Sequence, residues 1–148
     1  MKSLRELSDF RVRKEKGYEL QQLEGLNHLC GRLRISGLEN VESKERALEA
    51  KLSDKKYLTT LILEWPLQPS SQHPDLEAEV IEGLCPPSQL TKLVIYGYRG
   101  WKCPSWLEQK FSSLRCLELE HCVNLEALPD ISELFIHLDE LRLLLFTS

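Results

Sequence analysis

The sequence has 148 residues, of which 42% are hydrophobic and 28% charged, a composition that excludes a disordered tail and a membrane-embedded chain. The net charge of −4 gives no general attraction to nucleic acid or to acidic lipid. Leucine is in clear excess, with 30 leucines against 5 valines and 6 isoleucines, while 7 prolines and 7 glycines would interrupt the helices of a bundle. Excess leucine with frequent helix breakers indicates a repeat.

One short pattern recurs along the chain: a leucine, two further residues, and then two apolar residues separated by one. The six copies occupy residues 7–12, 29–35, 58–63, 90–95, 114–119 and 138–143, the second with one additional residue. The apolar pairs begin at Phe10, Leu33, Leu61, Leu93, Leu117 and Leu141, so the steps are 23, 28, 32, 24 and 24 residues. Leucine-rich repeats have a step of about 20–29 residues.

This spacing predicts the fold. Successive side chains of a strand point to opposite faces, so both members of each apolar pair point inward, and only stacked repeats can bury them. We therefore predict an α/β fold, a leucine-rich-repeat solenoid with a curved parallel sheet on the concave side and short helices and loops on the convex side. The whole chain, residues 1–148, forms one domain of about six repeats in this prediction.

A first convex helix is expected after the second strand. Ser43 can cap a helix that runs through Leu52. Val41, Leu48 and Leu52 are spaced seven and four residues apart, which predicts one buried stripe.

The later connections are predicted to differ from one another. A second helix is expected from about Leu76 to Leu84, after an exposed loop at residues 66–74 that explains the 32-residue step. Residues 103–107 are expected to form a turn anchored by the large side chain of Trp106. Cys122 is expected to be a small buried residue that helps the backbone turn.

Three stretches resemble the leucine-rich-repeat region of plant intracellular nucleotide-binding disease resistance proteins. Two of them are GRLRISGLENV at residues 31–41 and KKYLTTLILEW at residues 55–65. The third, residues 93–107, matches the family's glycine-tyrosine and then proline-x-tryptophan signature, with Cys103 in place of the usual phenylalanine. The likeness extends from about Leu4 to Leu143.

The resemblance implies a non-catalytic, cytoplasmic protein-recognition domain. Such a domain would sense pathogen effectors or guarded host proteins and help to autoinhibit an attached nucleotide-binding switch. The chain itself has no Gly-x-x-x-x-Gly-Lys-Ser/Thr loop for nucleotide phosphates, and no cofactor is predicted. It also stops just after a strand without a polar closing repeat, so we expect a segment of a longer array.

The candidate binding surface is the concave face, formed by residues that flank or separate the apolar pairs. It should run from basic, through an apolar patch, to acidic, and a central tyrosine with charges around it is typical of protein recognition. The candidate protein-binding residues are Arg32, Arg34, Ile62, Glu64, Lys92, Val94, Tyr96, Glu118 and Glu120. The alternative is that these charges only keep an exposed strand face soluble.

The expected partners are a protein ligand and, in a full-length receptor, its own nucleotide-binding domain, whose acidic surface the basic first rows would face. Lysine and arginine are too few and too mixed with acids for a nucleic-acid groove, and the longest apolar run, residues 143–146, is too short for a membrane span. The five cysteines include no CxxC pair, which favours a reducing, intracellular setting.

Other functions stay open at this point. The main alternative is a leucine-rich-repeat adaptor or inhibitor with no immune role, which an upstream nucleotide-binding domain in the parent gene would argue against. An enzyme is a third class, although no catalytic set is marked out by the sequence. A metal site is not expected, because His121, Cys103, Cys116 and Cys122 lack the paired spacing of zinc ligands.

Overall fold

The computed structural model describes residues 9–13, 20–25, 29–65, 74–100, 106, 114–122 and 140–144. The strands are β1 (Asp9–Arg11), β2 (Gly31–Ser36), β3 (Leu58–Glu64), β4 (Lys92–Tyr96), β5 (Cys116–Glu120) and β6 (Glu140–Leu144). The α-helices are α1 (Lys44–Leu48) and α2 (Pro74–Gly83), and the 3-10 helices are η1 (Leu20–Leu23), η2 (Leu38–Asn40) and η3 (Leu52–Asp54).

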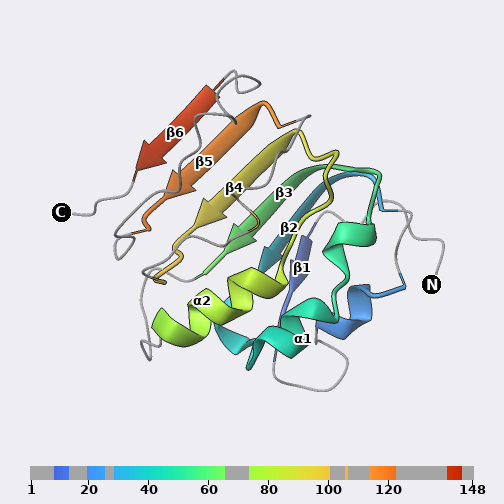
Figure 1. The fold of residues 1–148 in the computed structure, drawn as a ribbon, viewed down its shortest axis with the longest axis vertical. Coiled ribbons are helices and arrows are strands. Elements are labelled where there is room, and N and C mark those ends of the chain that lie inside the picture. Colours follow the sequence, from blue (N-terminus) through green and yellow to red (C-terminus); the bar gives the residue numbers. More distant parts are fainter. Residues whose placement is uncertain are drawn as a thin grey trace.

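The six strands form one parallel sheet in which the spatial order follows the chain, from β1 to β6 (Figure 1). From β2 onward, the predicted apolar pairs are in register. One ladder joins Leu33, Leu61, Leu93, Leu117 and Leu141, and the next joins Ile35, Leu63, Ile95, Leu119 and Leu143. The predicted fold class, an α/β leucine-rich-repeat solenoid, is confirmed.

The first strand is an exception to the predicted alignment. The repeat spacing places Phe10 beside Leu33, but the structure pairs Phe10 with Ile35 and Arg11 with Ser36. The first repeat is therefore displaced by two residues along β2. A shift of two keeps every side chain on its predicted face, because strand side chains alternate with a period of two. Val12 is accordingly buried beyond the end of β1.

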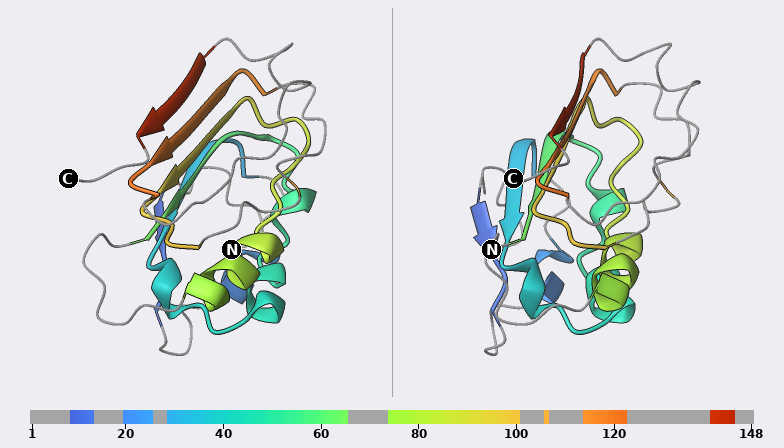
Figure 2. Two further views of the ribbon diagram at one scale, coloured as in Figure 1. Left: turned by 60° about the vertical axis from the view of Figure 1, so that its left-hand side comes forward. Right: turned by 90° about the vertical axis from the view of Figure 1, so that its left-hand side faces the viewer.

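The described elements make two layers. Seen along the sheet, α1, α2 and the 3-10 helices all lie on one side of it, and no described element covers the other side (Figure 2). We call the uncovered side the helix-free face; it corresponds to the predicted concave face. The apolar pairs face the helices, and the residues that flank or separate them point to the helix-free face.

The core lies between these two layers. The apolar pairs of β2 to β5 are all buried, and Val80, Ile81 and Leu84 of the α2 region are buried against them. Burial of a leucine or isoleucine side chain contributes about 1.5–3 kcal/mol, so the stacked pairs are the main source of stability. The helix predicted at 76–84 is present at 74–83; Val80, Ile81 and Leu84 are buried as predicted, and Leu76 is half-buried. Pro74, predicted to belong to the loop, is the first residue of α2, and residues 66–73 of the predicted loop lie outside the described residues.

The first convex helix is shorter than predicted, and its buried stripe is different. Ser43 caps α1 as expected, since its Oγ accepts a hydrogen bond from the Arg46 backbone N–H. The helix ends at Leu48, however, and Lys51 adopts a left-handed φ of 52°. Leu48 is consequently 50% exposed, and Ala47 takes the buried position.

Backbone closeness explains why alanine is the buried residue of α1. A Cβ at Gly83 of α2 would lie 2.7 Å from the Lys44 carbonyl oxygen and 2.8 Å from the Ala47 Cβ. The two helices are thus in contact through their smallest residues. A leucine in place of Ala47 would not fit at this distance.

Two predicted anchors hold the connections to the core. The Trp106 side chain is buried and its Nε1 donates a hydrogen bond to the Ile81 carbonyl at 2.7 Å. Cys122 is also buried, and its Sγ donates weakly to the carbonyls of Ile95 and Glu120. Both residues have the structural role that was predicted for them. The rest of the predicted turn, residues 103–105 and 107, lies outside the described residues.

Candidate functional site

Three rows of side chains cross the helix-free face, perpendicular to the strands. We call them the amino, central and carboxyl rows, in the direction of the parallel strands. The amino row contains Arg32, Thr60, Lys92 and Cys116; the central row contains Arg34, Ile62, Val94 and Glu118; the carboxyl row contains Glu64, Tyr96 and Glu120. All nine candidate residues from the sequence lie in these rows.

The first ion pair of the face joins the central row to the carboxyl row. Arg34 Nε donates to Glu64 Oε1 at 2.8 Å, and the Arg34 Nη2 group contacts the same oxygen. Arg34 is in register with Ile62, so the pair runs diagonally to the residue two positions further along β3. Diagonal neighbours on one face of a sheet are within reach of long side chains.

A second pair repeats this geometry two strands further on. Lys92 Nζ lies 3.9 Å from Glu118 Oε1. Lys92 is in register with Cys116, and Glu118 is again two residues further along the next strand. The face was predicted to run from a basic region, through an apolar region, to an acidic region. The structure differs in that Arg34 and Lys92 form ion pairs with carboxylates of the same face.

Arg32 and Glu120 differ from the paired charges. Arg32 is exposed in the amino row and Glu120 is half-buried in the carboxyl row. Within the described part of the chain, neither side chain forms a hydrogen bond or ion pair. These two residues are the members of the candidate set whose charge is available to a partner.

The apolar patch is smaller than the sequence predicts. Ile62 and Tyr96 are half-buried, but Val94 is only 8% exposed. Val94 lies between Lys92 and Tyr96 on the same face of β4, and both of these residues are more exposed than Val94. Ile62 and Tyr96 thus provide the accessible apolar surface.

His121 is a site residue that sequence reasoning missed. Its ring packs edge-on against the Tyr96 ring, with centroids 5.2 Å apart and an interplanar angle of 75°. This T-shaped arrangement is a favoured geometry for two rings. It holds the Tyr96 ring in place at the carboxyl end of β4.

The backbone of His121 explains how its ring reaches Tyr96. His121 follows the last residue of β5 and has a left-handed φ of 56°. The residues that follow β2 and β4, Gly37 and Gly97, have φ values of 71° and 76°. The recurring glycine is the sequence signal that could have identified this turn, and a side chain there is strained by about 1 kcal/mol or more.

Buried titratable groups lie away from these rows. Burial in the helical layer lowers the pKa of Lys55 to about 8, although Asp54 and Glu24 act in the opposite direction. Burial, and secondly the charge of Glu82, raises the pKa of the Cys85 thiol. Neither group adds chemistry to the helix-free face.

The described residues contain no group of three or more His, Cys, Asp or Glu side chains that could hold a metal ion. Cys85, a half-buried cysteine after α2, has a free thiol. None of the helices in the described ranges has the length and hydrophobicity needed to cross a bilayer. What the rows offer chemically is two ion pairs, the charges of Arg32 and Glu120 that have no partner among the described residues, the ring of Tyr96 and the aliphatic side chain of Ile62.

A parallel sheet built from leucine pairs at repeat spacing, with all of the described helices on one side of it, defines a leucine-rich-repeat protein. Comparison with known families agrees: the family of R13L1/DRL21 leucine-rich repeats matches residues 20–147. The chain belongs to this family.

Its relatives are plant disease resistance proteins. The chain is 36% identical over 132 residues to the disease resistance protein RGA2 of Solanum bulbocastanum. The aligned region covers 88% of this chain and 14% of that protein. It is 34% identical over 133 residues to the disease resistance RPP13-like protein 1 of Arabidopsis thaliana, covering 84% of this chain and 13% of that protein. The chain therefore spans about one seventh of the length of these relatives, and no solved structure matches it significantly.

Proposed function

We propose that this chain is the non-catalytic protein-recognition part of a plant immune receptor. It acts in the cytoplasm, where it binds pathogen effectors or host proteins that the receptor guards. Family membership and the names of the relatives support the immune role. Leucine-rich repeats generally present an extended surface to protein partners, which supports a binding function.

The observation that carries this proposal is the composition of the helix-free face. Tyr96 and Ile62 offer half-exposed apolar surface near the middle of the sheet, and the pair of Arg34 with Glu64 borders it. Tyrosine in a rigid setting contributes contact area at a low cost in conformational entropy. The ring of Tyr96 is already positioned by His121, so little order has to be created on binding.

We also propose a second role, restraint of a nucleotide-binding domain attached in the complete receptor. Its support is Arg32, an exposed cation with no partner in the described ranges. An acidic surface of the attached domain would complement it. The residues 1–148 then act as one recognition unit of about six repeats within a longer array.

The recognition role is tested by the double substitution Tyr96→Ala and Ile62→Ser in the complete receptor. We expect a pathogen-triggered defence response at least tenfold weaker, because two central contacts of about 1 kcal/mol or more are lost. The response is measured by transient expression in leaves, with receptor abundance followed by immunoblot. Both substitutions are on a solvent-facing surface, so abundance should be unchanged.

The matched control changes an equally apolar, exposed position elsewhere. Tyr57→Ala together with Leu48→Ser removes two side chains that are 59% and 50% exposed outside the three rows. This control receptor should respond like the original. A full response from the Tyr96 and Ile62 variant at normal abundance would contradict the proposed recognition surface.

A further inference from the structure

Tyr96 has a carboxylate residue on each side of it across the sheet. Its register partners are Glu64 on β3 and Glu120 on β5. Neighbouring strands of a sheet are about 4.8 Å apart, so the two glutamates are the immediate neighbours of the phenol ring in the carboxyl row. The order of the row is therefore carboxylate, aromatic ring, carboxylate.

The aromatic ring of this row is held in one orientation. The edge-on contact with His121 fixes it from the β5 side, and Tyr96 is half-buried. A second aromatic ring in a strained left-handed turn is an unusual way to end a strand, since Gly37 and Gly97 stand at the corresponding places. The strain is consistent with a turn that serves the Tyr96 site.

The charges around Tyr96 leave an acidic excess. Arg34 contacts only the Oε1 atom of Glu64, so the Oε2 atom has no hydrogen-bond partner among the described residues. Lys92 in the amino row and Glu118 in the central row form an ion pair, so their charges balance each other. The carboxylate of Glu120 has no such balance in the described part of the chain. A cation placed over the ring would therefore meet one unmatched negative charge and one spare carboxylate oxygen.

We propose that Tyr96, Glu64 and Glu120 form a receptor for a cationic side chain, an arginine of the partner protein. The guanidinium group is planar and weakly hydrated, so it stacks on the phenol ring while its N–H groups donate to carboxylate oxygens on either side. This inference rests on the proposed function, because it takes the helix-free face as the recognition surface. Beyond that function, it specifies which kind of partner side chain the surface binds, namely arginine.

The test compares two peptides that differ only in charge. Acetyl-Gly-Gly-Arg-Gly-Gly-amide and the same peptide with citrulline, a neutral isostere of arginine, are titrated over the 148-residue chain on a biosensor surface. We expect a Kd about fivefold lower for the arginine peptide, from the cation–π contact and the exposed ion pair together. Raising the salt concentration should reduce this preference.

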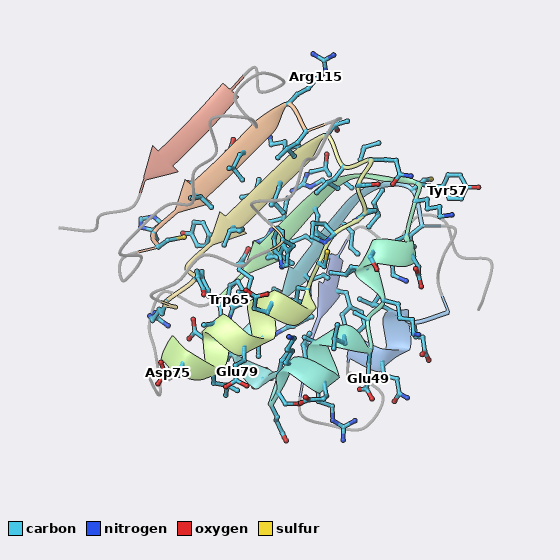
Figure 3. The ribbon with its side chains drawn as sticks, in the orientation of Figure 1. Glu49, Tyr57, Trp65, Asp75, Glu79 and Arg115 are labelled. Carbon is cyan, nitrogen blue, oxygen red and sulfur yellow. The ribbon has the colours of Figure 1, made fainter. Side chains whose placement is uncertain are left out.

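Three substitutions and two controls test whether the preference for the arginine peptide over the citrulline peptide depends on Tyr96, Glu64 and Glu120. Tyr96→Leu, Glu120→Gln and Glu64→Gln should each reduce it at least twofold, and Glu120→Gln is nearly isosteric, so folding is preserved. Tyr57→Leu, just before β3, and Glu79→Gln, on α2, change exposed residues outside the three rows and should leave the preference unchanged (Figure 3). Circular dichroism verifies the fold of each variant.

Equal Kd values for the arginine and citrulline peptides would overturn the inference. So would a preference that survives both Tyr96→Leu and Glu120→Gln. The proposed function fails separately: the Tyr96→Ala and Ile62→Ser receptor would then respond fully while the arginine preference of the chain persists. If that receptor loses its response but the two peptides bind equally, recognition uses this face without selecting a cation.

Discussion

Lys55 is a lysine that the fold buries completely. Its side chain lies in the helical layer, where Nζ donates a hydrogen bond to the Leu23 carbonyl at the end of η1. Loss of hydration lowers its pKa to about 8 from an ordinary value of 10.5, even though Asp54 and Glu24 favour the charged form. This hydrogen bond joins η1 to the turn before β3. The burial that accompanies it makes the charged form of Lys55 less favourable.

The lowered pKa predicts how stability depends on pH. Between pH 8 and 10.5 the unfolded chain binds a proton at Lys55 that the folded chain has released, so the free energy of unfolding rises with pH. From pH 7.5 to pH 10, we expect the original protein to gain about 2 kcal/mol relative to Lys55→Met. Urea unfolding of both proteins at the two pH values measures this gain.

The control for Lys55 is its neighbour in the sequence. Lys56 is exposed, so Lys56→Met should follow the original protein at both pH values. The interpretation would be wrong if the free energies of unfolding of Lys55→Met and of the original protein changed by the same amount between pH 7.5 and pH 10.

At the scale of elements, the contact between α1 and α2 sets the thickness of the helical layer. Glu49, Asp75 and Glu79 lie on its outer surface, while Trp65 lies between the sheet and α2 (Figure 3). The two helices meet where Gly83 faces the backbone of Lys44 and the Ala47 side chain. Small residues at this point allow α2 to hold Val80 and Ile81 against the sheet.

Gly83→Ala should therefore destabilise the protein by about 1–2 kcal/mol, although alanine is the better helix former. The added methyl group would meet backbone and Cβ atoms at 2.7–2.8 Å, and these cannot rotate away. The midpoint of urea unfolding measures the loss. Gly25→Ala is the matched control, because nothing lies within 4 Å of a Cβ there; equal stabilities of the two variants would contradict this account of the helix contact.

At the scale of the molecule, the charge is distributed along the solenoid. Residues 1–74 contain 13 basic and 11 acidic residues, a net charge of +2, and residues 75–148 contain 6 and 12, a net charge of −6. Arg34 and Lys92 are paired within the helix-free face, but Arg32 is exposed at its basic end. The basic end therefore offers Arg32, together with Arg11 of the neighbouring strand β1, which is also exposed, to an acidic surface of an attached domain.

Arg32→Glu in the complete receptor should weaken the restraint that we propose. Loss of one favourable contact and gain of a repulsive one should raise the response without a pathogen trigger about fivefold. The untriggered defence response in leaves is the measurement. Lys51→Glu makes the same change of charge at an exposed position of the helical layer and should have no effect. An unchanged resting response for Arg32→Glu would exclude this residue from the restraint.

The face of every strand could be predicted from the sequence because alternation is a local property. Leu61 and Leu63 must point the same way in any strand that contains them, and stacking is the only means of burying such pairs. Capping by Ser43 and burial of Cys122 were predictable for the same reason, since each depends on a few adjacent residues. The nine candidate residues could thus be assigned to one face before any contact was known.

Contacts between strands were beyond the reach of a single sequence. The alignment of Phe10 with Ile35, rather than Leu33, depends on how β1 docks, because a slip of two residues keeps both faces intact. Leu48 is exposed because α2 approaches α1 at Ala47, a distance that neither helix specifies by itself. The position of each strand and helix in the sequence depends on adjacent residues. The register and distance between two elements depend on how they pack, and a single sequence does not specify this.

At the candidate site, too, some features follow from the sequence and others depend on the packing of the repeats. The sequence by itself determined that Arg34, Glu64 and Tyr96 share a face, because side-chain parity is set within each strand. Only the tertiary structure decided that Arg34 pairs diagonally with Glu64, and that His121 supports the Tyr96 ring. Both contacts join residues of different repeats, so they depend on the register between strands and on a left-handed turn, which exist only when the repeats are stacked.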